Sequence, residues 1–184
     1  MTRTLISRPL ACAILAAATA LGALAAASLA AAPAAHAAIG SATCTGTSAI
    51  SYTPGLTNTP QTITYIETDT FHCVSTDPAL SSGTFQVTVT LPGASCTSAG
   101  IFTNTPYTIS WNNGAATTIS LSFTDAVVNG TEQVTGTGPV TGGEFAHGNA
   151  TIIWAYPVLD LTACSTPQGL TGQSGPLTAQ ITQL

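Results

Sequence analysis

Residues 84–91, Thr84-Phe85-Gln86-Val87-Thr88-Val89-Thr90-Leu91, decide the fold class of this chain. Apolar side chains alternate with threonine or glutamine along the whole stretch, which is the period-two pattern of a β-strand with one buried and one wet face. Residues 38–184 are rich in Thr, Ser, Gly and Val throughout, and no run has the 3.6-residue apolar spacing of an amphipathic helix. The sequence therefore predicts an all-β protein.

A hairpin that follows this strand has a register that the sequence specifies. Apolar side chains occupy odd positions on both sides of Asn112-Asn113-Gly114, namely Tyr107, Ile109 and Trp111 before it and Ile119, Leu121 and Phe123 after it. Apolar residues face each other across the hairpin only if the numbers of opposed residues add up to an even number. A two-residue loop at Asn113-Gly114 would pair odd-numbered with even-numbered positions. We therefore predict a three-residue loop with Gly114 left-handed in a G1 bulge, which places Trp111 opposite Ala115 and Tyr107 opposite Ile119.

The remaining strands suggest the architecture. They are predicted at residues 43–52, 61–73, 131–137, 150–156 and 177–181, and Asn129-Gly130 is predicted as another hairpin turn. About seven to eight short strands separated by turn signals favour a two-sheet β-sandwich of immunoglobulin-like architecture. A closed β-barrel is the alternative. No linker long enough to divide two domains is visible.

The N-terminal segment has the pattern of an export signal. Arg3 and Arg8 precede an Ala/Leu-rich stretch at residues 10–32, which ends in Pro33 and Ala35-His36-Ala37. A membrane anchor is the competing interpretation because the apolar run is long enough to span a bilayer. The helix-breaking proline and the Ala-x-Ala site favour cleavage between Ala37 and Ala38. We therefore predict a signal peptide at 1–37 and a secreted, extracellular domain at 38–184, with no membrane association after cleavage.

Cleavage changes the charge of the domain. Arg3 and Arg8 are the only basic residues of the chain, so residues 38–184 contain no Lys or Arg and all seven acidic residues. Without cationic side chains the acidic domain has no conventional means of holding phosphate groups. Nucleic acids and anionic membrane surfaces are therefore excluded as partners.

Four cysteines remain after cleavage, and they predict two disulfides. An even number in an exported domain favours disulfides, for which three connectivities exist, whereas the closely spaced pairs of a zinc site are absent. Cys44 and Cys73 lie symmetrically about Asn58-Thr59 in the turn-rich stretch 53–60, so a hairpin folded there sets them opposite each other, which leaves Cys96 to pair with Cys164. The same register puts two acidic residues, at positions 67 and 69, on the cysteine face, so a bulge or a different partner remains open.

The residues that suggest catalysis form a weak pattern. His72 and His147 are the only histidines left after cleavage, and a serine with His147 and Glu144 would supply the groups of a hydrolase triad. There is no G-x-S-x-G element, and residues 142–148 have the composition of a glycine-rich loop between strands. We therefore predict no enzyme activity, no catalytic residue and no cofactor.

Two acidic residues on one predicted strand suggest a metal site. Glu67 and Asp69 project to the same side of the strand and are candidates for binding calcium or for acting as paired carboxylates. A dedicated calcium loop brings several oxygen ligands close together in sequence, which is not seen here. The expectation is a solvated face, flanked by Thr64, Thr68 and Thr70, with no metal.

Aromatic residues raise the question of sugar binding, because flat rings stack on sugars. Trp111 and Tyr107 share the apolar side of the predicted hairpin, and Trp154 and Tyr156 lie in an apolar run, so all four are expected in the core. This leaves Tyr52 and Tyr65 as candidates for exposed contacts.

Several short motifs carry a resemblance to a known family. They are Cys44-Thr45-Gly46-Thr47, Tyr52-Thr53-Pro54-Gly55-Leu56-Thr57, Cys73-Val74-Ser75, Trp111-Asn112-Asn113-Gly114 and Leu159-Asp160-Leu161-Thr162-Ala163-Cys164. With the signal, they resemble a family of uncharacterised secreted proteins of actinomycetes over most of the domain. The resemblance implies export and an all-β fold, and it supplies no activity.

These observations predict a non-enzymatic structural or protein-interaction module, for example a subunit of an extracellular or cell-surface assembly, bound to another extracellular protein. Edge strands and loops are the usual binding surfaces of such domains. An alternative is an inhibitor of an extracellular protease that is not trypsin-like, using a loop such as residues 95–106. A weaker alternative is a carbohydrate-binding module.

Overall fold

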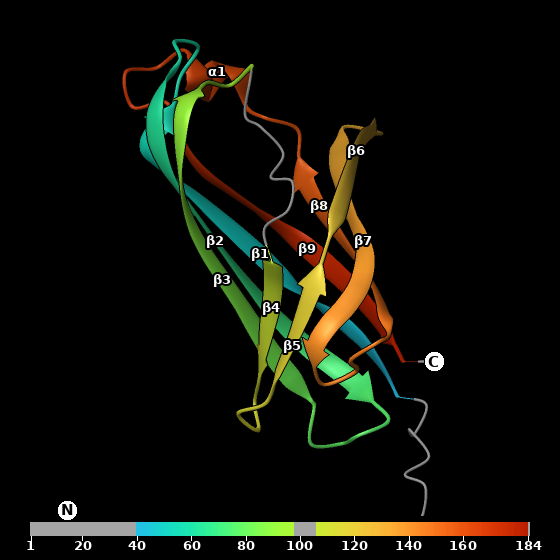
Figure 1. Cartoon of the computed structure of the whole chain (residues 1–184). Coiled ribbons are helices and arrows are strands. Elements are labelled where there is room, and N and C mark those ends of the chain that lie inside the picture. Colours follow the sequence, from blue (N-terminus) through green and yellow to red (C-terminus); the bar gives the residue numbers. More distant parts are fainter. Residues whose placement is uncertain (1–39, 98–105, 184) are drawn as a thin grey trace, which may run out of the picture. The chain divides into compact units, whose positions relative to one another are not determined.

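A computed structural model describes residues 40–97 and 106–183. These residues form nine strands and one short helix (Figure 1). The elements are β1 (Ser41–Leu56), β2 (Gln61–Ser75), β3 (Ser82–Ala94), β4 (Pro106–Trp111), β5 (Ala116–Ser120), β6 (Ser122–Val128), β7 (Thr131–Gly143), β8 (Asn149–Pro157), α1 (Leu161–Cys164) and β9 (Leu170–Thr182). The predicted all-β class is confirmed.

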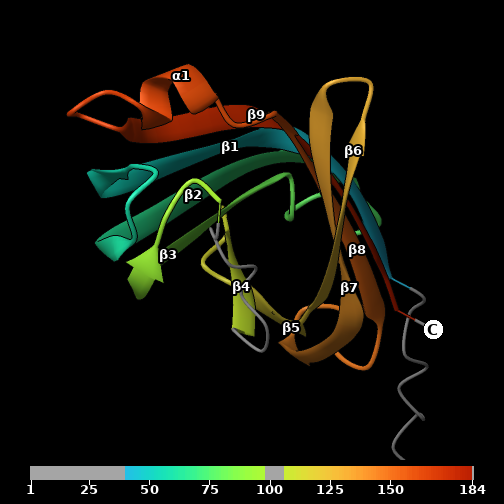
Figure 2. The same cartoon turned by 90° about the horizontal axis from the view of Figure 1, so that it is seen from above.

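The strands close into an antiparallel β-barrel. Strands that follow one another in the chain are hydrogen-bonded neighbours from β1 to β5 and from β6 to β9. The first and last strands also pair, and β5 pairs with β7. Because β5 and β6 together form one interrupted strand, the barrel has eight strands in an up-and-down order. Seen from above, β9, β1, β2 and β3 curve around one side, and β8, β7 and β6 stand opposite (Figure 2).

The predicted immunoglobulin-like sandwich is therefore wrong, and the barrel is the correct architecture. A sandwich keeps two separate sheets, whereas here a single sheet closes on itself through Ile119 opposite Val140. The strands are also longer than predicted, since β1 runs through Pro54 and Gly55 and β7 runs through Pro139. Long strands that curve at glycines are what a barrel requires.

The two predicted turns are confirmed. Tyr107 lies opposite Ile119 in the β4–β5 hairpin, Gly114 has a φ of 85°, and the Trp111 amide donates to the Ala115 carbonyl at 2.9 Å. In the β6–β7 hairpin, Asn129 and Gly130 both have positive φ and join Val128 to Thr131.

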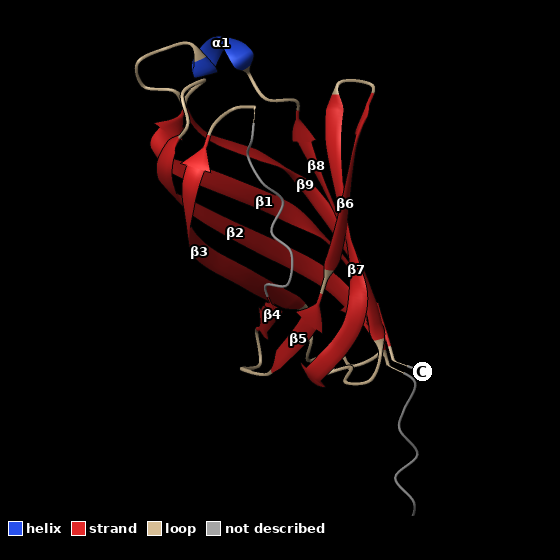
Figure 3. Cartoon of the chain, turned by 45° about the horizontal axis from the view of Figure 1, so that its top comes forward, coloured by secondary structure: helices blue, strands red, loops and turns tan. Residues whose placement is uncertain are grey.

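The barrel is packed with side chains at the end away from α1. The interior there holds large buried residues from six strands and the turn after β7: Phe71, Ile109, Trp111, Ile119, Val140, Phe145, Ile152 and Ile181. The Trp111 indole donates to Thr117 Oγ1 at 2.8 Å and meets the Phe145 ring edge-on at 6.1 Å. Figure 3 shows α1 at the opposite end, which is also the end of the β6–β7 turn.

The strand is interrupted where β5 passes into β6. The pairing of β6 with β7 continues that of Ile119 with Val140 without a change of register, but Leu121 itself is not in a strand. A Cβ atom at the facing Gly138 would lie 1.8 Å from the Ser120 carbonyl oxygen. Only glycine allows the two backbones to approach this closely.

We expect Gly138→Ala to lower the free energy of unfolding by about 1 to 3 kcal/mol, because the backbones must separate to admit the methyl group. Gly142→Ala is the matched control in the same strand, because no atom lies within 4 Å of its Cβ position. Urea unfolding of both variants tests this expectation. Equal stability of the two would contradict the role of Gly138 in this close approach.

The two disulfides join Cys44 to Cys73 and Cys96 to Cys164. This is the connectivity that the hairpin symmetry predicts, since Cys44 lies opposite Cys73 in an uninterrupted β1–β2 register. The predicted signal peptide, with Ala37 and Ala38, lies outside the described residues. Among those that are described, no helix has the length and apolar character needed to cross a membrane.

Candidate ligand-binding site

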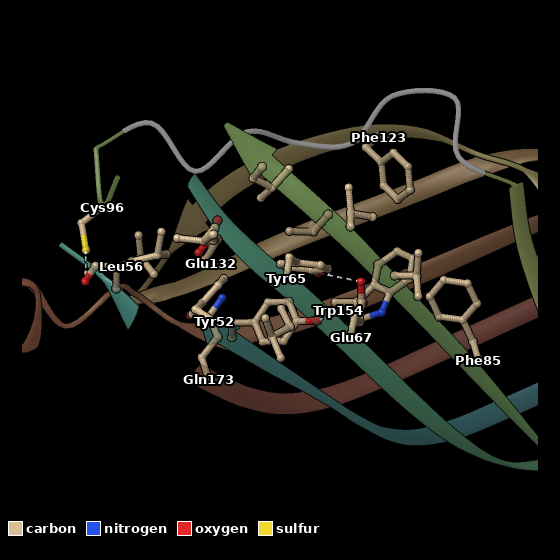
Figure 4. A pocket seen from close by; sticks show the side chains of 18 of the residues that line it. Tyr52, Leu56, Tyr65, Glu67, Phe85, Cys96, Phe123, Glu132, Trp154 and Gln173 are labelled. Atoms are coloured by element: carbon tan, nitrogen blue, oxygen red, sulfur yellow. Dashed lines mark hydrogen bonds between the residues drawn. The ribbon is translucent and has the colours of Figure 1, made fainter. Parts of the chain in front are cut away.

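The α1 end of the barrel is hollow. A cavity of about 240 Å³ lies between the walls formed by β1, β2 and β3 and by β7 and β8 (Figure 4). Partly exposed residues such as Leu159 and Gln173 belong to its lining, so the cavity reaches the surface. An eight-stranded barrel is just wide enough to be filled by side chains or to hold one small ligand. In this barrel, side chains fill the interior at one end, and the other end has space for a small ligand.

Most of the cavity lining is apolar or aromatic. Three aliphatic side chains come from alternating residues of β3, and others come from β1, β2, β7 and the segment after β8. Seven aromatic rings complete it: Tyr52, Tyr65, Phe85, Tyr107, Phe123, Trp154 and Tyr156. Several of these rings touch one another, for example Phe85 stacked on Tyr107 at 3.8 Å between centroids. Such contacts hold the rings in fixed positions.

Glu67 is a carboxylate in the wall of this cavity. It projects inward from β2, where it lies opposite Ile50 of β1 and Val87 of β3. The Tyr65 hydroxyl donates to Glu67 Oε2 at 2.7 Å, as Figure 4 shows. Glu67 Oε1 accepts longer hydrogen bonds from Ser48 at 3.4 Å and from Tyr156 at 3.5 Å. All three donors are neutral hydroxyl groups.

Asp69 lies next to Glu67 on the inner face of β2 and is fully buried. Its Oδ2 accepts hydrogen bonds from the Tyr107 hydroxyl and from the Trp154 indole at 3.0 Å. Its Oδ1 has no hydrogen-bond partner among the described residues. Tyr107 and Trp154 also line the cavity, so the hydrogen bonds of Asp69 hold two of the lining rings in place.

Burial raises the pKa of both carboxyl groups. The pKa of Glu67 is raised to about 7, mainly by burial and then by the charge of Asp69, against the opposing effect of its hydroxyl donors. Burial likewise raises the pKa of Asp69. No Lys or Arg occurs in the described residues to offset these charges. The inner face of the barrel therefore holds its carboxyl groups without a countercharge.

The tyrosines around Glu67 remain protonated at neutral pH. Burial raises the pKa of Tyr65 and of Tyr156, and the charge of Glu67 raises both further. The pKa of Tyr52 is raised by burial and by the charges of Glu132 and Glu67. These hydroxyl groups are consequently available as hydrogen-bond donors to the carboxylates.

The structure corrects two predictions about this site. Glu67 and Asp69 do not lie on a solvated face, because the register that pairs Cys44 with Cys73 turns them into the barrel. Tyr52 and Tyr65 are not exposed contacts, since each keeps only 7% of its surface accessible. Tyr107, Trp111, Trp154 and Tyr156 are buried as predicted.

The residues considered for catalysis lie away from the cavity. His72 and His147 are exposed, and neither they nor Glu144 line it. The described residues contain no group of three or more His, Cys, Asp or Glu side chains placed to hold a metal ion. Of the loop proposed for protease inhibition, residues 98–105 lie outside the described part of the chain.

Comparison of the chain with protein-family models, with curated proteins and with solved structures finds no match.

Proposed function

We propose that this protein binds, without transforming it, a small and largely apolar molecule in the open end of its barrel. The observation that carries the proposal is the division of one barrel into a filled half and a hollow half. Side chains fill the interior around Trp111, whereas the interior around Tyr65 encloses about 240 Å³. Leaving such a space empty forfeits packing contacts, which a ligand would restore.

The lining suits a small molecule better than a macromolecule. The rings and aliphatic groups face the barrel interior rather than an outer surface, so only a molecule that enters the barrel reaches them. The volume equals that of about eight water molecules, at about 30 Å³ each. Because the cavity also reaches the surface, this fits a ligand with one to three rings. The protein-interaction module, the protease inhibitor and the sugar-binding module stay predictions from the sequence pattern.

We also propose an extracellular location, which two disulfides and the predicted export signal support. Disulfides persist in oxidising compartments and are rare in the reducing cytosol. A secreted binding protein of this kind would capture its ligand outside the cell.

Binding of N-phenyl-1-naphthylamine, an uncharged dye whose fluorescence rises in apolar surroundings, tests the function. We expect saturable binding by the full chain, expressed for export and purified in oxidised form. Val89→Trp should weaken it at least tenfold, because Val89 lines the cavity and the indole would occupy the space. Val74→Trp is the control, since Val74 is 82% exposed and outside the cavity. Absence of saturable binding, or equal binding by both variants, would contradict the proposal.

A further inference from the structure

The cavity has a charge that its own residues do not balance. Glu67 and Glu132 belong to its lining, and Asp69 lies buried beside Glu67. The described part of the chain has no Lys or Arg, and its two histidines are exposed and outside the cavity. Buried charges in proteins are normally paired with an opposite charge. No described residue supplies one here, so a carboxylate in this cavity is either neutralised by a proton or balanced by a bound cation.

The hydrogen-bond partners of Glu67 include no positively charged donor. Its oxygens accept from Tyr65, Ser48 and Tyr156, and two of these bonds are long, at 3.4 and 3.5 Å. The hydroxyl of Tyr156 makes its shorter bond, at 2.7 Å, to Ser48 rather than to the carboxylate. Oxygen Oε1 thus accepts only long hydrogen bonds from neutral donors. A charged donor would form a stronger hydrogen bond with it.

The rings beside Glu67 add a second attraction for positive charge. Tyr52 and Tyr65 lie 5.9 Å apart between centroids, and Figure 4 shows Tyr52, Tyr65 and Trp154 around Glu67. The face of an aromatic ring carries negative charge and attracts cations, most strongly where water is excluded. A carboxylate surrounded by such rings suits an organic ammonium group attached to an apolar body. An anionic ligand would be repelled by the same carboxylates.

We propose that the molecule bound in this cavity carries a positively charged nitrogen, which lies against the Glu67 carboxylate and the surrounding tyrosine rings. This inference rests on the proposed binding function and adds the chemical class of the ligand, an aromatic or aliphatic amine or quaternary ammonium compound. The nitrogen replaces the proton of Glu67 as the countercharge. Binding of a permanent cation therefore releases a proton from the protein wherever Glu67 is protonated in the free state.

The probes are phenyltrimethylammonium and tert-butylbenzene, which have the same shape and differ by one positive charge. We expect the cation to bind at least tenfold more tightly than the hydrocarbon at pH 8, measured through Trp154 fluorescence or calorimetry. Glu67→Gln should reduce this preference at least fivefold and leave the affinity for tert-butylbenzene within twofold. Glu144→Gln removes one charge away from the cavity and should leave the preference unchanged.

The unmodified protein provides a second test, which depends on no variant. The affinity for phenyltrimethylammonium should rise severalfold from pH 6 to pH 8 as Glu67, with its pKa raised to about 7, loses its proton. The other titratable groups around Glu67 are Asp69 and Tyr65 on its own strand, Tyr52 on β1, Tyr107 on β4, Tyr156 on β8 and Glu132 on β7. Those tyrosines stay protonated in this range. The affinity for tert-butylbenzene should not change.

The two proposals fail in different ways. Equal affinity for both probes at pH 8, or a preference that Glu67→Gln leaves unchanged, overturns the cation proposal while the binding function stands. Failure of phenyltrimethylammonium to bind overturns it also. The binding function itself fails if the uncharged dye shows no saturable binding, or if Val89→Trp and Val74→Trp bind it equally.

Discussion

The free energy of unfolding is expected to fall by about 2.5 kcal/mol as the pH rises from 5 to 8. Glu67 has its pKa raised from 4.5 to about 7 in the folded protein, mainly by burial and by the nearby Asp69. The folded state therefore holds this proton more tightly than the unfolded chain does. At about 1.4 kcal/mol per pKa unit, the whole shift corresponds to about 3.5 kcal/mol, of which about 2.5 kcal/mol is lost between pH 5 and pH 8.

The sign and the pH window follow from the two pKa values. Below about pH 4.5 both states are protonated and the contribution to stability is fully present. Between pH 4.5 and 7 the unfolded chain ionises first, so unfolding becomes progressively easier. Above pH 7 the folded state ionises too, and this contribution levels off. Asp69, whose pKa is also raised by burial, acts in the same direction.

Glu67→Gln tests this assignment because the amide keeps the shape and cannot ionise. The variant should match the wild type near pH 5, exceed it at pH 8 and show a clearly smaller slope between them. Glu144→Gln, which changes a residue outside the cavity, should keep the wild-type slope. Urea unfolding at both pH values, with the disulfides intact, measures all three proteins. A wild-type stability that is flat or rises over this range would contradict the assignment.

The position of Glu67 and Asp69 could be derived from the sequence, but their environment could not. The symmetry of Cys44 and Cys73 about Asn58-Thr59 predicts a register in which both acidic residues share the cysteine face. That face is the barrel interior. A solvated face was expected because burying a charged group is costly. The alternation of side chains along the strand, which places both residues on the inner face, was the better guide.

The hydrogen-bond donors that offset the cost of burying these carboxyl groups come from strands distant in sequence. Ser48 belongs to β1, Tyr107 to β4, and Trp154 and Tyr156 to β8, and all donate hydrogen bonds to Glu67 or Asp69. No local pattern shows that these donors meet. Barrel closure was unpredictable for the same reason, because it depends on pairing Ile119 with Val140 and Ser41 with Thr182, and the sequence pattern of each strand fits a sandwich equally well.

The alternation of β2 was the available signal for the site. Ile63, Tyr65, Glu67, Asp69, Phe71 and Cys73 occupy one face, and threonines occupy most of the other. Two carboxylates inside an otherwise apolar and aromatic face indicate either a register error or a polar interior. Because the disulfide fixes the register, the second interpretation follows.

Removing the Cys96–Cys164 disulfide is expected to lower the free energy of unfolding by about 4 kcal/mol. The bond closes a loop with a sequence separation of 68, and the entropy lost by the unfolded chain grows with loop length. It also joins the segment after β3 to α1 at the hollow end of the barrel. There the Cys96 amide donates to the Thr57 carbonyl at 2.9 Å, and the Asn58 amide donates to the Cys164 carbonyl at 3.3 Å.

The same change should weaken ligand binding, because Cys96 lines the cavity. We expect the Cys96→Ala, Cys164→Ala double variant to bind N-phenyl-1-naphthylamine at least fivefold less tightly at a temperature where it remains folded. The control is the Cys44→Ala, Cys73→Ala double variant. Its loop, with a separation of 29, should cost a similar, slightly smaller stability, while neither cysteine lines the cavity.

A comparison of the two double variants separates global stability from the shape of the cavity. Circular dichroism during guanidinium unfolding gives the stability of each, and dye titration gives the affinity. If both variants lose affinity equally, the effect comes from general loosening of the barrel, and the Cys96–Cys164 bond has no special part in the site. If only the first loses affinity, the disulfide holds the segment after β3 in place as one wall of the binding cavity.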